Sequence, residues 1–412
     1  MNIIGVDINM FKYKGMNLQN PRLRKRLRRV PLTFTRASVA YDKYGNSVPV
    51  DTPRFGIAGG PNDGVLIEEA HTNLLTANQS TGTDTLGNTT GFGKFSGTDI
   101  SSDSSTYIQG NKSLKVSLSG ATANEGVNTG SIDVAGGKTY TQSVKIKIPK
   151  GSVLTIQIVE RDSADVLMGA TSETITGTGD FQDVSVTRAF EATGVKQRVY
   201  IISPVAAKFD FNVDMLQLAQ TPYPLSWTLG GTTQAAETFT LPGHTLNPIS
   251  GTIEVEAYIE PHHKGRAWVL LDQNNKVRVI HTGDGFLQFQ TNNGVDTTTT
   301  PGIPDTDLVD GFNRVTARYN EDEISIMVNG DPDTLSVEAD PSLPPTNTNP
   351  LTLDNSFNGL IRELTLSNTA RPDNDAVARA TRPEGHGFGV DRQVTLIAPL
   401  KNNLNAYRVA TV

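Results

Sequence analysis

Apolar and polar side chains alternate along many short segments of this chain, and this period of two limits the possible folds more than any other feature. Aliphatic residues take every second position in segments such as SLKVSLS, SVKIKI and LTIQI. This spacing places them on one face of a strand and leaves the other face to solvent. We therefore expect antiparallel sheets in an all-β fold. The predicted core faces are Leu114, Val116 and Leu118; Val144, Ile146 and Ile148; Leu154, Ile156 and Ile158; and Phe211, Val213 and Met215.

Turn residues divide the expected strands into two groups. The chain has 412 residues with 38 Gly and 22 Pro, which suits two or three domains with many turns. A proline-rich joint, TPYPLSW, separates the groups, and Asn329-Gly330 is a strong hairpin signal in the second. We predict two antiparallel β-sandwich or jelly-roll modules. The predicted parts are an N-terminal basic arm (1–32), an extended connector (33–75), the two modules (76–222 and 223–383) and a C-terminal tail (384–412).

The arm contains the segment NPRLRKRLRRVP, which has six cations and no acid. The net charge of the chain is −7, so the remaining residues carry −13. Asn20 and Pro21 suit the start of a helix, and Leu23, Leu27 and Val30 would form an apolar stripe along it. We expect this helix to dock onto an acidic protein surface; a solvated arm, or contact with nucleic acid or anionic lipid, are the alternatives. The predicted partner-docking residues are Arg22, Arg24, Lys25, Arg26, Arg28 and Arg29.

Several common features are missing from the sequence. It has no cysteine, no signal-peptide pattern and no apolar run of the ~20 residues that a membrane helix needs. We therefore expect a protein made in a reducing cytosol, without disulfides and without membrane insertion. No aromatic residues alternate with the arginines of the arm, so specific nucleic-acid binding is not expected.

Paired acidic residues are the first candidates for catalysis. Glu254 and Glu256 point to one side of one expected strand, as the acid and the nucleophile do in some glycosidases. Aliphatic residues occupy the other side of this strand, so a solvated polar face is the simpler interpretation. Glu68 and Glu69 are adjacent, face opposite ways and cannot share a substrate. We expect no catalytic residues, and a glycosidase is the alternative.

Candidate metal and sugar ligands are equally weak. His262 and His263 have no third ligand nearby, which makes a poor metal site. Two turn-like segments offer the oxygen ligands that calcium takes, although tight turns use the same residues. They contain Asp272, Asn274, Asn275, Asp354 and Asn355. Trp227 and Trp268 could stack on sugars, but such residues more often belong to a core. We predict no cofactor, with calcium as the alternative.

Three phrases resemble the segment that opens many tailed-bacteriophage structural proteins. They are FTRAS (34–38), PRF (53–55) and GVLIEEAHTNLL (64–75), in that order, with Val65 and His71 as replacements. In those proteins the segment leads into a carbohydrate-binding-module-like jelly roll. By alternation, the third phrase would bury aliphatic residues and leave Glu68, Glu69 and His71 in solvent, as a connector between the arm and the modules.

The two modules resemble known families as well. The first closes on MLQLAQTPYPLSW, which is similar to the closing phrase of that jelly roll, although Ala219 replaces a glutamate. The second resembles concanavalin A-like (laminin G-like or pentraxin-like) domains at GTIEVEAYIEP, RVTARYNEDEISIMVNG and NGLIRELTLS. The arm and the tail lie outside the resemblance.

The resemblance implies a structural protein of a phage virion, placed in the tail, baseplate or fibre or decorating the capsid. Its implied partners are other virion proteins, further copies of itself and host-surface glycans. A virion enzyme that degrades polysaccharide (a depolymerase) and a purely architectural decoration protein without a ligand are the alternatives.

Overall fold

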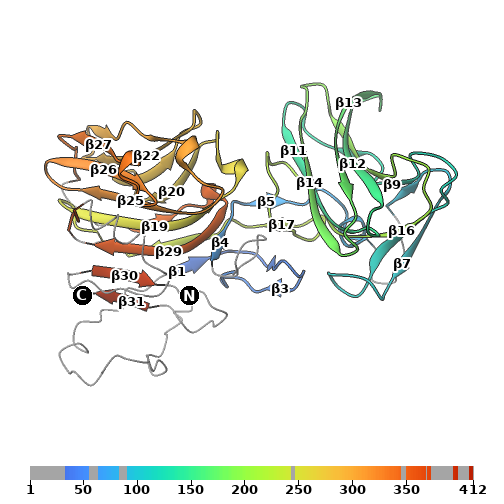
Figure 1. Cartoon of the computed structure of the whole chain (residues 1–412), viewed down its shortest axis with the longest axis horizontal. Coiled ribbons are helices and arrows are strands. Elements are labelled where there is room, and N and C mark those ends of the chain that lie inside the picture. The colour runs from blue at the N-terminus through green and yellow to red at the C-terminus, as the bar shows by residue number, and fades with distance from the viewer. Residues whose placement is uncertain are drawn as a thin grey trace, which may run out of the picture. The chain divides into compact units, whose positions relative to one another are not determined.

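In the structure, a computed structural model, strands are by far the main regular secondary structure and helices are few and short, which confirms the all-β prediction (Figure 1). The structure describes residues 33–54, 64–82, 91–242, 246–344, 349–367 and 369–372, together with the strands at 393–397 and 408–411. The chain divides into two compact units. The first consists of Arg36–Asp51 and Ala70–Ala236; the second takes the residues up to Thr35, Thr52–Glu69 and Glu237–Val412. The chain therefore passes from one unit to the other four times.

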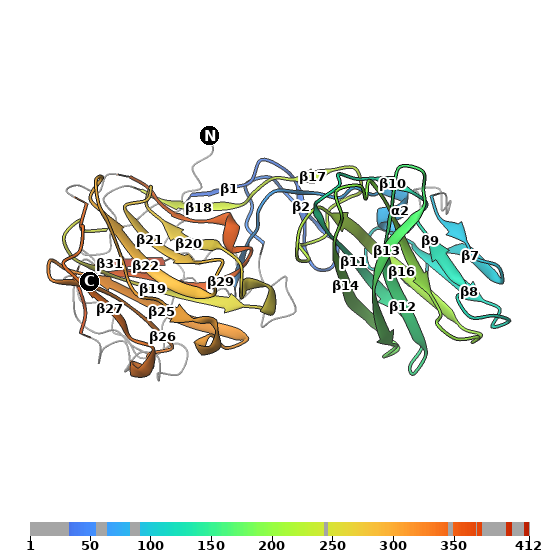
Figure 2. The same cartoon turned by 90° about the horizontal axis from the view of Figure 1, so that it is seen from above.

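The first unit is a sandwich of two antiparallel sheets (Figure 2). The five-stranded sheet contains, in spatial order, β14 (Phe181–Ala189), β11 (Thr139–Lys147), β16 (Asp210–Ala219), β8 (Ser113–Leu118) and β7 (Thr98–Asp103). The six-stranded sheet contains β13 (Leu167–Thr176), β12 (Val153–Arg161), β15 (Lys196–Ile202), β9 (Gly126–Asn128) and β6 (Gly93–Lys94), with β10 (Ile132–Asp133) paired to β15. Aliphatic residues from both sheets form one core between them.

The second unit is also a sandwich, made of two eight-stranded sheets. One sheet is called the outer-row sheet below, because a row of polar residues crosses its outward face. It contains β1 (Thr33–Thr35), β18 (Thr238–Leu241), β28 (Leu351–Leu353), β20 (Trp268–Asp272), β21 (Val277–His281), β22 (Phe286–Asn292) and β23 (Thr297–Thr299), with β24 (Ile303–Pro304) paired to β22. The opposite sheet contains β27 (Ser336–Ala339), β26 (Glu323–Val328), β25 (Gly311–Tyr319), β19 (Gly251–Ile259), β29 (Gly359–Ser367), β30 (Gln393–Ile397) and β31 (Arg408–Thr411), with β4 (Val65–Ile67) paired to β29.

Short elements complete the described chain. Two small antiparallel pairs belong to the first unit: β2 (Ala40–Tyr41) with β3 (Ser47–Val48), and β5 (His71–Thr72) with β17 (Thr233–Gln234). The helical elements are α2 (Ala77–Thr81) and the 3-10 turns η1 (Pro261–His263), η2 (Asp305–Asp307), η3 (Pro332–Thr334) and η4 (Asn355–Phe357). Within the described residues, no helix is both long enough and apolar enough to span a membrane.

Turns between strands use residues that tolerate positive φ, and the turn predicted at Asn329-Gly330 is confirmed. Gly45, in the turn between β2 and β3, has φ of 75°, which glycine adopts without steric cost. Asn329 and Gly330 directly follow β26, with φ of 54° and 66°. Both residues tolerate this left-handed region, which explains why the pair is a reliable turn signal.

The alternation predicts the cores correctly except on β16. Phe211 and Val213 are core residues, but Met215 does not belong to the core cluster, whereas Leu216 and Leu218 do. The pairing of β16 with β11 shifts register at a bulge, where Met215 has φ of 49°. A bulge inserts one extra residue, so the inward positions move by one along the strand.

The predicted connector (33–75) is not a separate element. Its strand β1 pairs with β18, and its strand β4 pairs with β29, so both belong to sheets of the second unit. The rest of its described residues are divided between the two units. The predicted tail (384–412) likewise supplies β30 and β31 to the opposite sheet. The chain leaves the first unit after Ala236, later than the predicted boundary at 222.

Candidate functional site

The acidic residue Glu68 of the connector phrase is buried, so the prediction that it faces solvent is wrong. Arg54 donates two hydrogen bonds to the carboxylate of Glu237, at 2.8 and 2.7 Å, and one to Glu68 at 2.8 Å. All three side chains are at least nine-tenths buried. Burial opposes the charge of Arg54, but the carboxylates of Glu68 and Glu237 raise its pKa above the ordinary value. These three residues form a buried ion triplet with a structural role. The triplet links the segment 53–55 to the segment 64–75, two of the three segments that resemble phage structural proteins.

Other polar residues of these phrases satisfy buried backbone groups. The Arg36 guanidinium donates to the carbonyls of Ser38, Val48 and Pro49. His71, predicted to face solvent, is 5 % exposed, and its Nε2 donates to the Ser226 carbonyl at 2.8 Å. Asn73 is fully buried and donates to the carbonyls of Leu216 and Thr228. Buried polar groups need such hydrogen-bond partners. The polar residues of these segments therefore have a structural role rather than a catalytic or ligand-binding one. Glu69 is partly exposed, as predicted.

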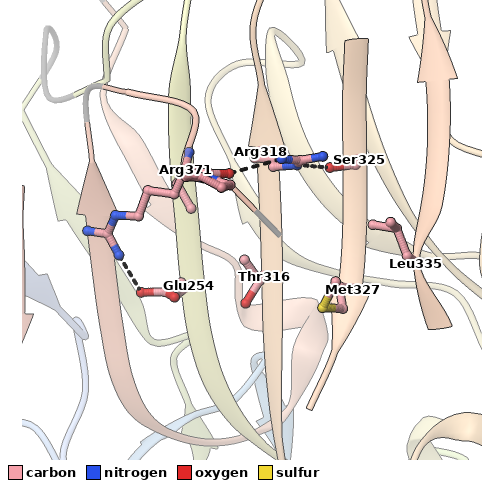
Figure 3. A pocket seen from close by; sticks show the side chains of 9 residues that line it. Glu254, Thr316, Arg318, Ser325, Met327, Leu335 and Arg371 are labelled. Carbon is pink, nitrogen blue, oxygen red and sulfur yellow. Dashed lines mark hydrogen bonds and ion pairs between the residues drawn. The ribbon is translucent and has the colours of Figure 1, made fainter. Parts of the chain in front are cut away.

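Glu254 and Glu256 lie on the face of β19 opposite to its core residues, as predicted. Glu256 is partly exposed, but Glu254 is buried, so the expected solvated face is wrong at Glu254. Figure 3 shows Arg371 reaching Glu254 at a shallow hollow of this face, with Nη1 and Oε2 3.1 Å apart. Glu256 accepts two hydrogen bonds from Arg362, at 2.9 and 2.5 Å. Each carboxylate is held by its own arginine, so the two do not form an open acid and nucleophile pair.

The candidate calcium ligands are used in turns. Asp272 accepts a hydrogen bond from the backbone N–H of Asn275 at 2.8 Å, and Asp354 accepts one from Ser356 at 2.8 Å as the N-cap of η4. Asn274 also has a turn conformation, with positive φ. Over the part of the chain that the structure describes, no three acidic, histidine or cysteine side chains are arranged to hold a metal.

The histidine pair and both tryptophans are packing residues. Burial lowers the pKa of His263 to about 2, and its ring stacks on Phe357 with centroids 4.7 Å apart. Trp268 is buried and donates from Nε1 to the His263 carbonyl at 2.7 Å. Trp227 is buried in the first unit and packs edge-on against Tyr41. The exposed indole faces that sugar stacking would require are therefore missing at these two positions.

A continuous polar row crosses the outward face of the outer-row sheet. Directly paired residues follow one another over seven strands. On β18, β28, β20, β21 and β22 they lie opposite to the core residues of the same strand. The members of this polar row are Thr33, Thr240, Thr352, Asp272, Arg278, Gln290 and Thr299. Each is at least partly exposed. Paired residues on one face of a sheet have neighbouring side chains, so the row forms one surface.

The centre of the polar row carries the informative side chains. The threonines of the row are no evidence for binding, because threonine is common on exposed strands for its strand propensity alone. A binding surface is suggested instead by Asp272, Arg278 and Gln290, which lie side by side on three neighbouring strands. Asp272 and Arg278 lie 3.5 Å apart, about a quarter exposed each. Among the described residues, no hydrogen bond uses the side chain of Gln290 or Thr299. Phe286 adds a ring that is 39 % exposed on the same face of β22.

Sequence reasoning missed this row for a physical reason. The residues come from segments as far apart as Thr33 and Thr352, and only the register of the sheet aligns them. The outward positions of each strand could be read from alternation, but not which strands are neighbours. The predicted docking residues of the arm, Arg22, Arg24, Lys25, Arg26, Arg28 and Arg29, lie outside the described residues.

A comparison with protein families finds a match for one region of the chain. Residues 231–376 match the family described as the concanavalin A-like lectin/glucanases superfamily, so this region forms a concanavalin A-like domain. None of the curated proteins compared with the chain matches it.

Several solved structures are similar to the chain at low identity. They include the CBM22-1 xylan-binding domain of Paenibacillus barcinonensis Xyn10C (17 % identity, 38 % of this chain, 99 % of that chain, TM-score 0.29) and a family 16 carbohydrate-binding module (18 %, 35 %, 99 %, 0.28). A third is the enzymatically active domain of tailspike protein 4 of bacteriophage CBA120 (11 %, 35 %, 21 %, 0.29). Similarity at these TM-scores does not by itself assign a function.

Proposed function

We propose that this protein is a non-enzymatic structural component of a phage particle, and that its second unit binds host-surface glycans. The observation that carries glycan binding is the polar row across the outer-row sheet. The lectin-containing family that matches residues 231–376 supports it. The place in a virion is supported by the resemblance of residues 34–38, 53–55 and 64–75 to phage structural proteins.

The chemistry of the row suits a saccharide lying across the strands. Sugar hydroxyls both donate and accept hydrogen bonds; Arg278 donates, Asp272 accepts and Gln290 does both. Neighbouring strands are about 4.8 Å apart, so an extended glycan meets a new side chain at each strand. Such shallow sites are individually weak and gain strength when many copies bind one surface.

The test is a glycan array probed with the full-length protein and with the variant R278A/Q290A. We expect the variant to lose roughly tenfold or more of the binding, because hydrogen bonds of a charged and a neutral group are removed. E338Q, an exposed substitution on β27 of the opposite sheet, serves as the matched control and should bind like the wild type. Equal binding by R278A/Q290A would show that the polar row is not the site.

Two further outcomes separate the alternatives. Incubation with host polysaccharide should release no new reducing ends; sustained release would identify a depolymerase and overturn the non-enzymatic assignment. An array without any signal, from a protein that still joins its particle, would identify an architectural decoration protein.

A further inference from the structure

A surface hollow of about 290 Å3 lies in the second unit and is not part of the polar row. It is lined by residues 301–304 around β24, by Asp307 of η2 and by residues 333–337 between η3 and β27. Asp307 and Asp333 are exposed, and none of the lining residues is basic. The apolar part of the lining comes from Pro301, Ile303, Pro304, Leu335 and Val337.

The lining defines the kind of ligand that fits. Two carboxylates beside apolar walls favour a partner that brings cations together with aliphatic groups, because a carboxylate that loses water needs a compensating charge. The chain itself has such a segment. Residues 22–30 combine six cations with Leu23, Leu27 and Val30, and no acid interrupts them.

The position of the hollow limits which cations of the same copy can reach it. The arm joins β1 at Thr33, the outermost strand of its sheet, whereas β24 pairs with the far edge of β22 and lies six strand spacings away. Six spacings amount to about 29 Å. The four residues from Arg29 to Thr33 span about 14 Å at most. Arg28 and Arg29 therefore cannot reach the hollow of their own chain, whereas Arg22 can, because eleven residues span up to about 40 Å. A contact that uses the whole segment, with Arg28 and Arg29, requires a second copy.

We propose that the basic segment of residues 22–30 binds this hollow on a second copy of the chain. The segment and the hollow are different surfaces, so the contact is head-to-tail, and repetition closes a ring or extends a filament. The cations pair with Asp307 and Asp333, and the leucines contact the proline and leucine walls. This assembly does not depend on glycan binding.

The test is the self-association of the full-length protein, measured by analytical ultracentrifugation over a concentration series. D307N/D333N and, separately, R24Q/R28Q/R29Q should each weaken association about tenfold or more, since each removes one side of the same charge contact. A synthetic peptide of residues 18–32 should compete with the wild-type association. High salt should weaken the contact, because exposed charges are screened within a Debye length of about 8 Å at physiological ionic strength.

D296N/E321Q is the matched control. It removes two exposed carboxylates of the same unit that do not line the hollow, and it should associate like the wild type. A monomeric wild type would overturn the proposal. So would loss of association in the arm variant without loss in D307N/D333N, because the segment would then bind another acidic surface.

Discussion

Asp214 is a carboxylate that the bulge on β16 places inside the first unit. It is fully buried, and its oxygens accept hydrogen bonds from the backbone N–H groups of Ile108 and Gln109, at 2.7 and 3.0 Å, and of Met215 at 2.7 Å. Desolvation raises its pKa from 3.8 to about 6, although these hydrogen bonds act in the opposite direction. Asp214 thus anchors the loop before β8 and takes up a proton in a mildly acidic medium.

This shift predicts the pH dependence of stability. Between about pH 4 and pH 6 the folded state binds more protons than the unfolded state, so the free energy of unfolding falls as pH rises through this window. Because of Asp214, the free energy of unfolding should fall by about 3 kcal/mol in total across this window. D214N should remove this fall, and urea unfolding of both proteins at several pH values measures the difference. Parallel pH profiles for the wild type and D214N would contradict the assignment.

At the scale of elements, β4 shows that the connector phrase is part of a core. Val65, Leu66 and Ile67 are all buried, and Val65 and Ile67 belong to the core of the second unit. The strand pairs with the first half of β29, while β30 pairs with the second half of the same strand. The main part of the second unit begins at Glu237, so β4 stabilises this unit from a segment far away in the sequence.

I67A should destabilise the second unit and leave the first unit unchanged. Removing a fully buried isoleucine side chain costs about 2–5 kcal/mol. The two tryptophans report on the units separately, because Trp227 lies in the first and Trp268 in the second. In a W227F background, I67A should lower the unfolding midpoint seen by Trp268 fluorescence. In a W268F background the Trp227 signal should not move; an equal shift of both signals would refute the assignment of β4.

At the scale of the whole molecule, the cationic segment of the arm and the β-sandwiches occupy different parts of the chain. The six cations of the arm precede the first described strand, and the remainder carries −13. A helix of the length expected from the sequence, about ten residues, would be too short to be stable alone in water, so we expect the arm to dock onto a partner surface. Among the described residues, each sandwich has a hydrophobic core of its own.

Deletion of residues 1–32 should therefore leave a soluble protein whose two units melt as in the full chain. Each unfolding free energy should change by no more than about 0.5 kcal/mol, as for changes outside a core. Under the proposed function, the truncated protein should fail to join the phage particle, which mass spectrometry of purified particles can measure. Incorporation at the normal copy number would place the anchor outside the arm.

The sequence by itself determined what depends on local pattern. Alternation identified the all-β class and most inward faces, such as Ile253 and Val255 on β19, because a strand places successive side chains on opposite faces whatever its neighbours are. Turn chemistry did the same for Asn329 and Gly330, since positive φ is a property of the residue itself.

The tertiary structure decided everything that depends on which strands are neighbours. The burial of Glu68 follows from Arg54 and Glu237, and the last of these lies 169 residues further along the chain. The change of face at Met215 follows from a bulge against β11, and the polar row from the register of seven strands. Local propensities carry no information on such pairings, because the energy of a pairing resides in contacts between residues distant in sequence.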